Sequence, residues 1–301
     1  MKHKTFFWFF APTAAAMLVF IFAPIVSVVT QSIFLPHEAV LVEVENCGPF
    51  GCTTETAIDQ DATEQLRAEQ PLGRFAGLQL YFDRSNLATS EVAEIWRSSE
   101  SWGAFFSDLY NLPFYRAMAF TLTYTFTVTP LLIALGFFIA VAVNSVARQI
   151  RGFLIFFSLL PMIVTPLVGS LILFWMIDAR GILGNAIAYL AADPDLSLKA
   201  STPLMWISLI VYGIWSSAPF AFVVFYAGLQ TVNRDTLESA IVDGANRWQR
   251  LRHVILPHLA PLIVFVALIH LMDAYRVFEE VVGFRAEAHV ISLQWLTYDL
   301  M

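Results

Sequence analysis

The sequence predicts an all-helical protein that crosses a lipid bilayer several times. Hydrophobic residues make up 58% of the chain and charged residues 14%, whereas a soluble domain is about half apolar and about a quarter charged. The mean hydropathy is +0.66. The apolar excess is concentrated in blocks near or above the ~20 residues that a helix needs to cross hydrocarbon, where lipid offers the backbone no hydrogen-bond partner. These blocks are Phe6–Phe34, Ala117–Val146, Phe153–Ile177, Thr202–Gln230 and Leu259–Phe278.

The first block follows a basic start, Met-Lys-His-Lys, which also opens secretory signal peptides. Phe6–Phe34 is much longer than the signal core of about 7–15 residues. Three consecutive alanines, Ala14–Ala16, could mimic a cleavage site, but they lie inside the apolar run and not after it. We therefore expect residues 1–34 to form a retained membrane helix.

The distribution of charge predicts the orientation, because arginine and lysine gather on cytoplasmic loops. A cytoplasmic N-terminus places Ala147–Gly152 and Thr231–His258 inside as well, and both segments are basic. The basic residues assigned inside are Lys2, Lys4, Arg148, Arg151, Arg234, Arg247, Arg250 and Arg252. Acidic residues gather in the segments assigned outside, which account for the net charge of -7. The charge pattern thus predicts a cytoplasmic N-terminus.

The outer segment after the first helix, residues 35–113, is polar and is expected to hold a small folded or partly ordered insertion. It contains both cysteines of the chain, Cys47 and Cys52, in the sequence CGPFGC. In an oxidising compartment this spacing favours a local structural disulfide across a Gly-Pro turn. Two free thiols remain an alternative, as does a metal site, for which further ligands are lacking nearby.

The segment between the fourth and fifth blocks predicts two short helices joined by a turn. Arg234–Val242 has an amphipathic pattern, and Gly244 can adopt the left-handed conformation that ends a helix. Arg247–Ile255 begins a second helix, which we expect Pro257 to stop or bend. Such a basic projection suits docking to a partner. A solvated loop enriched in arginine would explain the charges, but not the order of helix, glycine, helix and proline.

This segment resembles the EAA loop of ABC importer permeases, with Glu-Ala-Ala, a glycine and a terminal Leu-Pro at fixed spacing. Here the motif stands as Glu238-Ser239-Ala240, Gly244, Val254 and Leu256-Pro257, and it departs only at Ser239 and Val254. The resemblance implies that Glu238 contacts a cytoplasmic ATPase, Gly244 makes the turn and Ala240 permits close approach. The residues expected to couple to the ATPase are Glu238, Ser239, Ala240, Asp243, Gly244, Arg247, Leu256 and Pro257.

Further stretches look like the carbohydrate-uptake branch of that family, which includes permeases for maltose, trehalose and glycerol phosphate. These stretches are Gly181–Asn185, Trp215–Phe220, Gly228–Gln230, Asp243–Ala245 and Asp273–Glu279. The resemblance covers most of Ala117–Leu293 and implies the type I importer permease fold. It divides the chain into a first helix (1–34), a periplasmic insertion (35–113) and a permease core (114–301) with the coupling loop at 231–258. Members of the branch end with a further membrane helix, so we expect the sequence to be truncated before it.

The resemblance also implies a set of partners and a mechanism. The chain would be one subunit of a multi-pass importer in a bacterial inner membrane, surrounded by lipid and working by alternating access. A periplasmic binding protein would deliver a sugar, polyol or sugar phosphate, and a second homologous permease would complete the path. Two copies of a cytoplasmic ATPase would bind ATP and magnesium. This chain itself would hold no cofactor or metal and would not contact nucleic acid.

Ionisable residues within the bilayer are costly and suggest the solute path. His270, Asp273 and Arg276 are spaced three residues apart in the fifth block and lie along one helical face. They could bind hydroxyl groups; alternatively, Asp273 pairs with Arg276 only to brace the helix, and His270 is an interhelical hydrogen bonder. In the fourth block, Trp215, Ser217 and Phe220 could line the path near Pro219. Membrane aromatics, however, more often face lipid or other helices.

Other classes of function fit the sequence less well. The motifs HExxH, GxSxG and GxxxxGK[ST] are absent from the sequence, so no hydrolase or P-loop ATPase signature is present. A secondary transporter would show inverted repeats, which we do not find, and would leave the inner projection unexplained. A polyamine- or amino-acid-type ABC permease is the nearest rival. It would favour an acidic path, whereas here Arg276 accompanies Asp273.

Overall fold

The computed structural model describes residues 3–35, 39–48, 51–69, 73–83, 86–193 and 197–300. The chain divides into two compact units, Met1–Ser99 and Glu100–Met301. The division falls within the predicted insertion of residues 35–113, whose boundaries remain a prediction. Each unit is described by itself.

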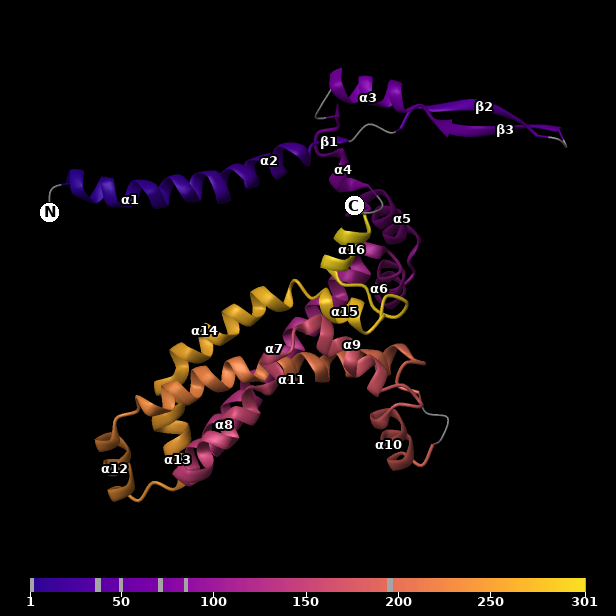
Figure 1. Cartoon of the computed structure of the whole chain (residues 1–301). Coiled ribbons are helices and arrows are strands. Elements are labelled where there is room, and N and C mark those ends of the chain that lie inside the picture. Colours follow the sequence, from indigo (N-terminus) through magenta and orange to yellow (C-terminus); the bar gives the residue numbers. More distant parts are fainter. Residues whose placement is uncertain are drawn as a thin grey trace. The chain divides into compact units, whose positions relative to one another are not determined.

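The first unit begins with a long apolar helix made of α1 (His3–Met17), the π-helical turn η1 (Leu18–Phe22) and α2 (Ala23–Gln31) (Figure 1). Pro24 is the second residue after η1, and a π turn accommodates a residue that cannot donate a backbone hydrogen bond. Large side chains such as Trp8 and Phe9 are exposed to the surroundings. An apolar helix with this exposure suits contact with lipid or with another protein's helix.

The remainder of the first unit contains short helices and two small antiparallel sheets, which the all-helical prediction did not include. Its elements are β1 (Phe34–Leu35), β2 (Leu41–Gly48), β3 (Gly51–Ile58), α3 (Gln60–Glu69), β4 (Arg74–Phe75), α4 (Gln79–Phe82) and α5 (Thr89–Ser98). Strand β1 pairs with β4, and β2 pairs with β3 in a register that sets Cys47 opposite Cys52. The cysteine side chains lie outside the described residues, so the disulfide remains a prediction.

Within the described residues of the second unit, all regular secondary structure is helical. Its elements are α6 (Trp102–Tyr110), α7 (Pro113–Ser145), α8 (Arg148–Ile163), α9 (Pro166–Met176), α10 (Ile182–Leu190), α11 (Thr202–Gln230), α12 (Arg234–Val242), α13 (Arg247–Arg250), η2 (Leu251–Ile255), α14 (Leu256–Ala274), α15 (Glu279–Gly283) and α16 (Leu293–Asp299). Helices α7 and α11 pack along each other, and α14 packs against both (Figure 1). Helix α15 packs against α9, and α16 packs against α7.

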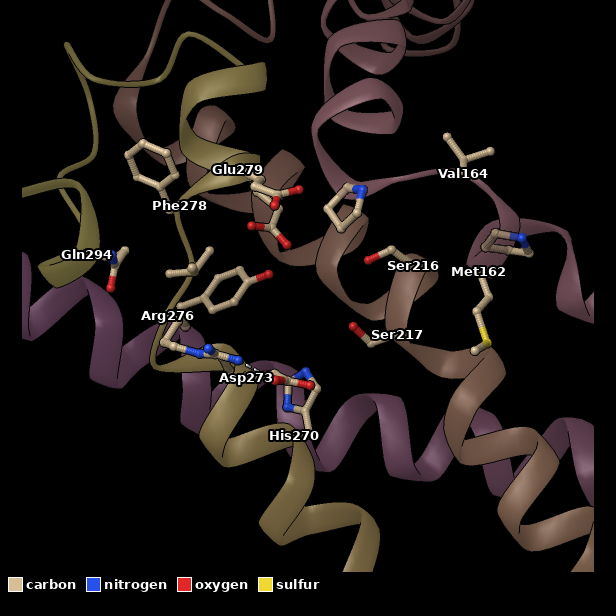
Figure 2. A pocket seen from close by; sticks show the side chains of 16 residues that line it. Met162, Val164, Ser216, Ser217, His270, Asp273, Arg276, Phe278, Glu279 and Gln294 are labelled. Atoms are coloured by element: carbon tan, nitrogen blue, oxygen red, sulfur yellow. Dashed lines mark hydrogen bonds and ion pairs between the residues drawn. The ribbon is translucent and has the colours of Figure 1, made fainter. Parts of the chain in front are cut away.

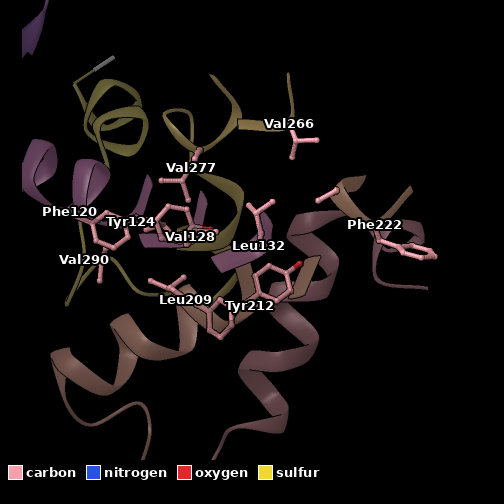
Figure 3. Packing of buried hydrophobic residues seen from close by; sticks show 14 of the residues in the cluster. Phe120, Tyr124, Val128, Leu132, Leu209, Tyr212, Phe222, Val266, Val277 and Val290 are labelled. Atoms are coloured by element: carbon pink, nitrogen blue, oxygen red, sulfur yellow. The ribbon is translucent and has the colours of Figure 1, made fainter. Parts of the chain in front are cut away.

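Large buried side chains fill the space between α7 and α11. Figure 3 shows Phe120, Tyr124 and Val128, which recur every four residues on one face of α7, opposite Leu209 and Tyr212 of α11. Elsewhere along α7 and α11, small residues let the two backbones approach each other closely, which is how membrane helices achieve close packing. This packed pair provides the rigid frame on which the other helices rest.

The third apolar block, Phe153–Ile177, is long enough for one span, and the prolines within it were expected to kink the helix; it is divided between two helices. Helices α8 and α9 are bent by 94° at a break before Pro166. Val164 and Thr165 are both extended, as the ring of a following proline favours for the residue before it. The break turns the start of α9 toward α15, and this contact shapes the site described below.

Four helices of the described part are long and apolar enough to cross a membrane, and the bent pair α8–α9 could be a fifth span. They are Phe6–Gln31, Pro113–Ser145, Thr202–Gln230 and Arg247–Ala274. Thr202–Gln230 has the predicted bounds. The last span begins earlier than predicted, because the helix does not stop at Pro257 but continues through it after the π-helical turn η2. The protein is a multi-pass membrane protein.

Candidate functional site

The segment of residues 231–258, here called the coupling segment, opens with a capped helix. The Asn233 side chain accepts a hydrogen bond of 2.8 Å from the backbone N–H of Asp235 at the start of α12. Gly244 ends the helix with a φ of +80°, a conformation that costs glycine little. The N–H of Ala245 donates to the Ala240 carbonyl at 2.9 Å and closes the turn. The predicted helix and glycine turn are confirmed.

A reciprocal cap starts the second half of the coupling segment. Asn246 and Gln249 each accept a hydrogen bond of 2.8 Å from the other's backbone N–H, which forms a capping box. The helix then runs without interruption from Arg247 to Ala274. At about 1.5 Å per residue, its 28 residues extend roughly 40 Å. One continuous helix, which includes the π-helical turn η2, therefore carries the end of the coupling segment and the far end of α14.

The surface of the coupling segment combines exposed apolar and charged side chains. Val242 is 86% exposed and Trp248 is 65% exposed, far more than a side chain packed within its own chain would be. Glu238, Ser239 and Arg247, three of the predicted coupling residues, are also exposed. Exposed large apolar residues next to polar ones are typical of a protein-binding surface.

A hollow of about 320 Å³ lies within the coupling segment, between α12 and the following helix. It is lined by Ala240, Asp243, Gly244, Ala245, Gln249, Arg250, His253 and Val254. Three predicted coupling residues, Ala240, Asp243 and Gly244, border it, whereas Leu256 and Pro257 lie at the start of α14. The structure places all the predicted coupling residues on one continuous segment, and their function remains a prediction.

A larger cavity of about 550 Å³, here called the polar cavity, lies at the opposite end of α14 (Figure 2). Its volume is within the range of small-molecule sites, roughly 300–1,000 Å³. It is lined by Tyr124, Pro161, Met162, Val164, Pro166, Ser216, Ser217, His270, Asp273, Ala274, Arg276, Val277, Phe278, Glu279, Glu280 and Gln294. Seven helices and two connecting segments thus contribute to one site.

Of the six residues predicted for the solute path, four line the polar cavity: Ser217, His270, Asp273 and Arg276. Trp215 and Phe220 do not. The ring of Trp215 instead lies near that of Tyr212, with 6.1 Å between the two ring centroids. Phe220 packs against the core and lies 6.4 Å from the ring of Phe265. Both belong to α11, but they point to other faces of that helix than Ser217 does.

Hydrogen bonds hold the polar groups of the cavity in place. Arg276 Nη2 lies 3.2 Å from Asp273 Oδ1, which is the pairing expected from their spacing. His270 Nδ1 lies 2.9 Å from Thr129 Oγ1 of α7. Glu279 Oε2 accepts a hydrogen bond of 3.2 Å from the N–H of Leu167 at the start of α9. A carboxylate at a helix N-terminus is favoured by the orphan N–H groups and by the helix dipole.

The acidic pair Glu279 and Glu280 and the amide of Gln294 also line the cavity and were not predicted from the sequence. Glu280 is partly buried, and burial raises the pKa of its carboxyl, with the neighbouring Glu279 adding to the effect. Two adjacent carboxylates just after an apolar block were the available signal. The route of the chain back toward α9 could not be foreseen from that signal.

A second ion pair lies outside the spans, between α9 and α11. Lys199 Nζ is 2.8 Å from Asp178 Oδ2 and 3.5 Å from the centroid of the Phe174 ring. The hydrogen bond from Lys199 and one from the N–H of Arg180 hold the pKa of the Asp178 carboxyl below its usual value. These contacts fasten the connection between the two helices. Among the described residues, no group of three or more His, Cys, Asp or Glu side chains could hold a metal ion.

The sequence that forms both sites is similar to that of a known family. Residues 132–276 match the sequence profile of the family described as binding-protein-dependent transport system inner membrane component. The matched range begins within α7 and ends at Arg276, so it includes the whole coupling segment and most of the polar cavity.

Several curated relatives are similar over the same region. The probable ABC transporter permease protein y4oQ of Sinorhizobium fredii is 30% identical over 66% of this chain and 60% of its own length. The trehalose transport system permease protein SugA of Mycobacterium tuberculosis is 30% identical over 68% of this chain and 64% of its own length. The arabinooligosaccharides transport system permease protein AraP of Bacillus subtilis is 30% identical over 58% and 56%. The chain spans less than two thirds of these relatives.

The fold is similar to that of a solved transporter. A chain in the crystal structure of a bacterial alginate ABC transporter, in complex with an alginate pentasaccharide-bound periplasmic protein, aligns with a TM-score of 0.52. The alignment covers 70% of this chain and 72% of that chain at 21% identity. At this identity the likeness establishes the helical importer permease fold alone.

Proposed function

Because the chain belongs to the family of binding-protein-dependent transport system inner membrane components, we propose that it imports a sugar or sugar-like solute as one membrane subunit of an ATP-driven transporter. It is related to permease subunits named for trehalose and arabinooligosaccharides. We assign ATP hydrolysis to a separate subunit, since this chain carries no P-loop sequence. The chain would then contribute a path and a coupling surface, and no enzymatic chemistry.

The observation that carries the proposal is the continuity between the coupling segment and the polar cavity. The helix from Arg247 to Ala274 has the coupling segment at one end and His270 and Asp273 at the other. A displacement of the coupling segment by a partner would therefore move the wall of the cavity. This is the mechanical requirement of alternating access driven from outside the membrane.

The exposed part of the coupling segment is the proposed docking surface for a cytoplasmic ATPase. Trp248 and Val242 supply apolar contact area, and Glu238 and Arg247 supply charged contacts around it. Two ATPase copies, which would carry ATP and magnesium, and a second homologous permease complete the proposed assembly. A periplasmic binding protein would deliver the solute on the opposite side.

The proposed location is the inner membrane of a bacterium, with the N-terminus in the cytoplasm. The basic residues of the coupling segment and of the first turn of α8 then face the cytoplasm, as the positive-inside rule requires. The polar cavity would be the part of the solute path that this subunit contributes. Its mixture of carboxylates, hydroxyls, an amide and an imidazole can bind a polar solute without a metal.

Co-purification from detergent-solubilised membranes tests the proposal. The intact chain should recover an ATPase subunit, and the complex should hydrolyse ATP faster when a sugar and its binding protein are added. Glu238→Lys, which reverses an exposed charge, should weaken this recovery while the chain still inserts into the membrane. Recovery of the chain alone, together with ion-driven uptake, would replace the proposal with a secondary transporter.

A further inference from the structure

Acidic groups outnumber basic groups in the polar cavity, and some of these charged groups already have hydrogen-bond partners. Asp273, Glu279 and Glu280 supply three carboxyl groups, and Arg276 supplies the one guanidinium among the lining residues. Arg276 is paired with Asp273 at 3.2 Å. Glu279 accepts the N–H of Leu167 at the start of α9. The one guanidinium of the lining thus already faces a carboxylate, and the other two carboxyl groups exceed the lining's cations. The site therefore offers an anionic ligand little compensation, while the carboxyl oxygens can still accept hydrogen bonds from hydroxyl groups.

The hydrogen bonds around Thr129 determine which nitrogen of His270 carries the proton. A threonine hydroxyl has a single hydrogen to donate. The Thr129 hydroxyl donates it to the Thr125 carbonyl at 2.7 Å, within the same helix. Thr129 Oγ1 can then only accept from His270 Nδ1, which lies 2.9 Å away. The proton of the neutral ring is thus on Nδ1, and Nε2 is a hydrogen-bond acceptor.

The His270 ring lines the polar cavity beside Asp273 (Figure 2). Because Nδ1 is engaged with α7, Nε2 is the nitrogen left for a ligand, and among the described residues it has no protein partner. The cavity therefore offers a ligand an imidazole acceptor together with the carboxyl oxygens. An acceptor-rich site binds ligands that donate.

On the premise of the proposed function, we propose that the polar cavity selects an uncharged, hydroxyl-rich solute and excludes anionic sugars such as sugar phosphates and uronates. Sugar hydroxyls would donate to His270 Nε2 and to the carboxyl oxygens of Glu279 and Glu280. A phosphate or carboxylate on the solute would meet those same oxygens without a free cation, and like charges at close range repel strongly in a partly dehydrated site.

The environment of Glu280 supports this selection independently of the hydrogen bonds. Burial, with help from Glu279, raises the pKa of the Glu280 carboxyl, which means that the site disfavours negative charge. The same desolvation and the same neighbour would act on an anionic group of the solute. A cationic solute would gain only a screened attraction from Glu279, because that side chain is exposed to solvent, and Asp273 is already paired with Arg276.

The test compares matched disaccharides on the purified transporter complex without its binding protein, so that selection by that protein plays no part. Each set contains a neutral sugar, its 6-phosphate and its 6-amino form, on α- and β-linked scaffolds. Binding is measured by ligand-induced protection against thermal unfolding. We expect the neutral member to bind at least ten times more tightly than the phosphate, and the amino form to gain no more than a few-fold.

Two variants locate the effect in the polar cavity. His270→Gln, which keeps an amide acceptor near the position of Nε2, should retain binding of the neutral sugar, and His270→Leu should lose it by about tenfold. Glu280→Gln should narrow the difference between the neutral sugar and the phosphate. Should His270→Leu fail to fold, His270→Gln and Glu280→Gln still decide the question.

Equal or tighter binding of the phosphate would overturn the inference, and so would strong preference for the amino form. The proposed function would survive either result if sugars still stimulate ATP hydrolysis. Absence of binding by any member would overturn the inference too. Only the additional loss of the ATPase partner would count against the importer itself.

Discussion

His270 of α14 and Thr129 of α7 are joined across the helix interface by a contact of 2.9 Å between Nδ1 and Oγ1. The contact lies on the helix that begins in the coupling segment at Arg247. It connects that helix to the packed pair of α7 and α11, next to the polar cavity. An interhelical hydrogen bond at this point both holds the cavity wall and fixes the acceptor that the wall presents.

Replacement of Thr129 by valine should destabilise the protein by about 1–3 kcal/mol, because His270 Nδ1–H would lose its buried acceptor. Thr125→Val is the matched control, since it lies on the same helix and both threonines are 6% exposed. Among the described residues, the buried Thr125 hydroxyl has no hydrogen-bond partner. Its removal should be neutral or stabilising. Thermal unfolding of both variants in detergent measures the difference, and equal effects would contradict the role given to Thr129.

Close packing between α7 and α11 leads to a second prediction. A Cβ at Gly136 would lie 2.6 Å from the Cβ of Ala221 and 2.8 Å from the N of Phe222. Gly136→Ala should therefore separate the helices and destabilise the protein by about 1–3 kcal/mol, which outweighs the gain in helix propensity of about 1 kcal/mol. The midpoint of thermal unfolding should fall.

Gly152→Ala in α8 is the control for that prediction. A Cβ there meets nothing within 4 Å, so only the helix propensity changes. This variant should be neutral or more stable by up to about 1 kcal/mol. Two shifts of the same sign would show that helix propensity, and not packing, controls position 136.

Local sequence signals predicted the elements whose boundaries they determine. Helix α12 has the bounds expected from its pattern, because Asn233 caps its start and Gly244 can turn the chain after its end. Helix α11 likewise matches a continuous apolar run with a proline in its first turn. Apolar composition alone could not locate the bend before Pro166, since apolar side chains continue on both sides of it. The β2–β3 hairpin was missed because its polar strands do not carry a strong apolar alternation.

The candidate site was predictable in part, for Ser217 on α11 and for the three polar residues at the end of the fifth block. The spacing of His270, Asp273 and Arg276 placed them on one face, and the structure confirms that all three line one cavity. Glu279, Glu280 and Gln294 join them because the chain turns after Ala274 and packs α15 against α9 and α16 against α7. Such contacts depend on tertiary structure, and no spacing rule applies to them.

The turn of the coupling segment leads to a third prediction. Gly244 has a φ of +80°, and no atom lies within 4 Å of the position of a Cβ there. Any effect of a substitution must therefore come from backbone strain. A β-branched residue at this positive φ raises the free energy of the folded turn by about 1–2 kcal/mol or more. Gly244→Val should reduce ATPase recovery and uptake at least tenfold, with normal abundance in the membrane. Gly244→Asn, which tolerates this conformation, should retain most activity; loss in both variants would point to a steric contact with the partner.

The Asp178–Lys199 pair leads to the fourth prediction, on the dependence of stability on pH. Lys199 lowers the pKa of Asp178 from its ordinary value of 3.8, so the pair stabilises the folded protein above that value. The stabilisation is lost as the pH falls through the lower pKa of the folded state. Asp178→Asn should therefore reduce the thermal unfolding midpoint at pH 7, and the difference from the unmodified protein should shrink steadily as the pH falls below about 4.

Lys199→Met separates the charge of this pair from its packing. The Lys199 ammonium lies 3.5 Å from the centroid of the Phe174 ring, and methionine keeps an apolar side chain over that ring. If the ion pair is responsible, Asp178→Asn should cost little once Lys199 is methionine, and the pH dependence should disappear from the double variant. Additive effects of the two substitutions would mean that each side chain acts through separate contacts. A difference that persists unchanged at the lowest pH, where the Asp178 carboxyl is protonated, would show that the effect does not come from the charge of Asp178.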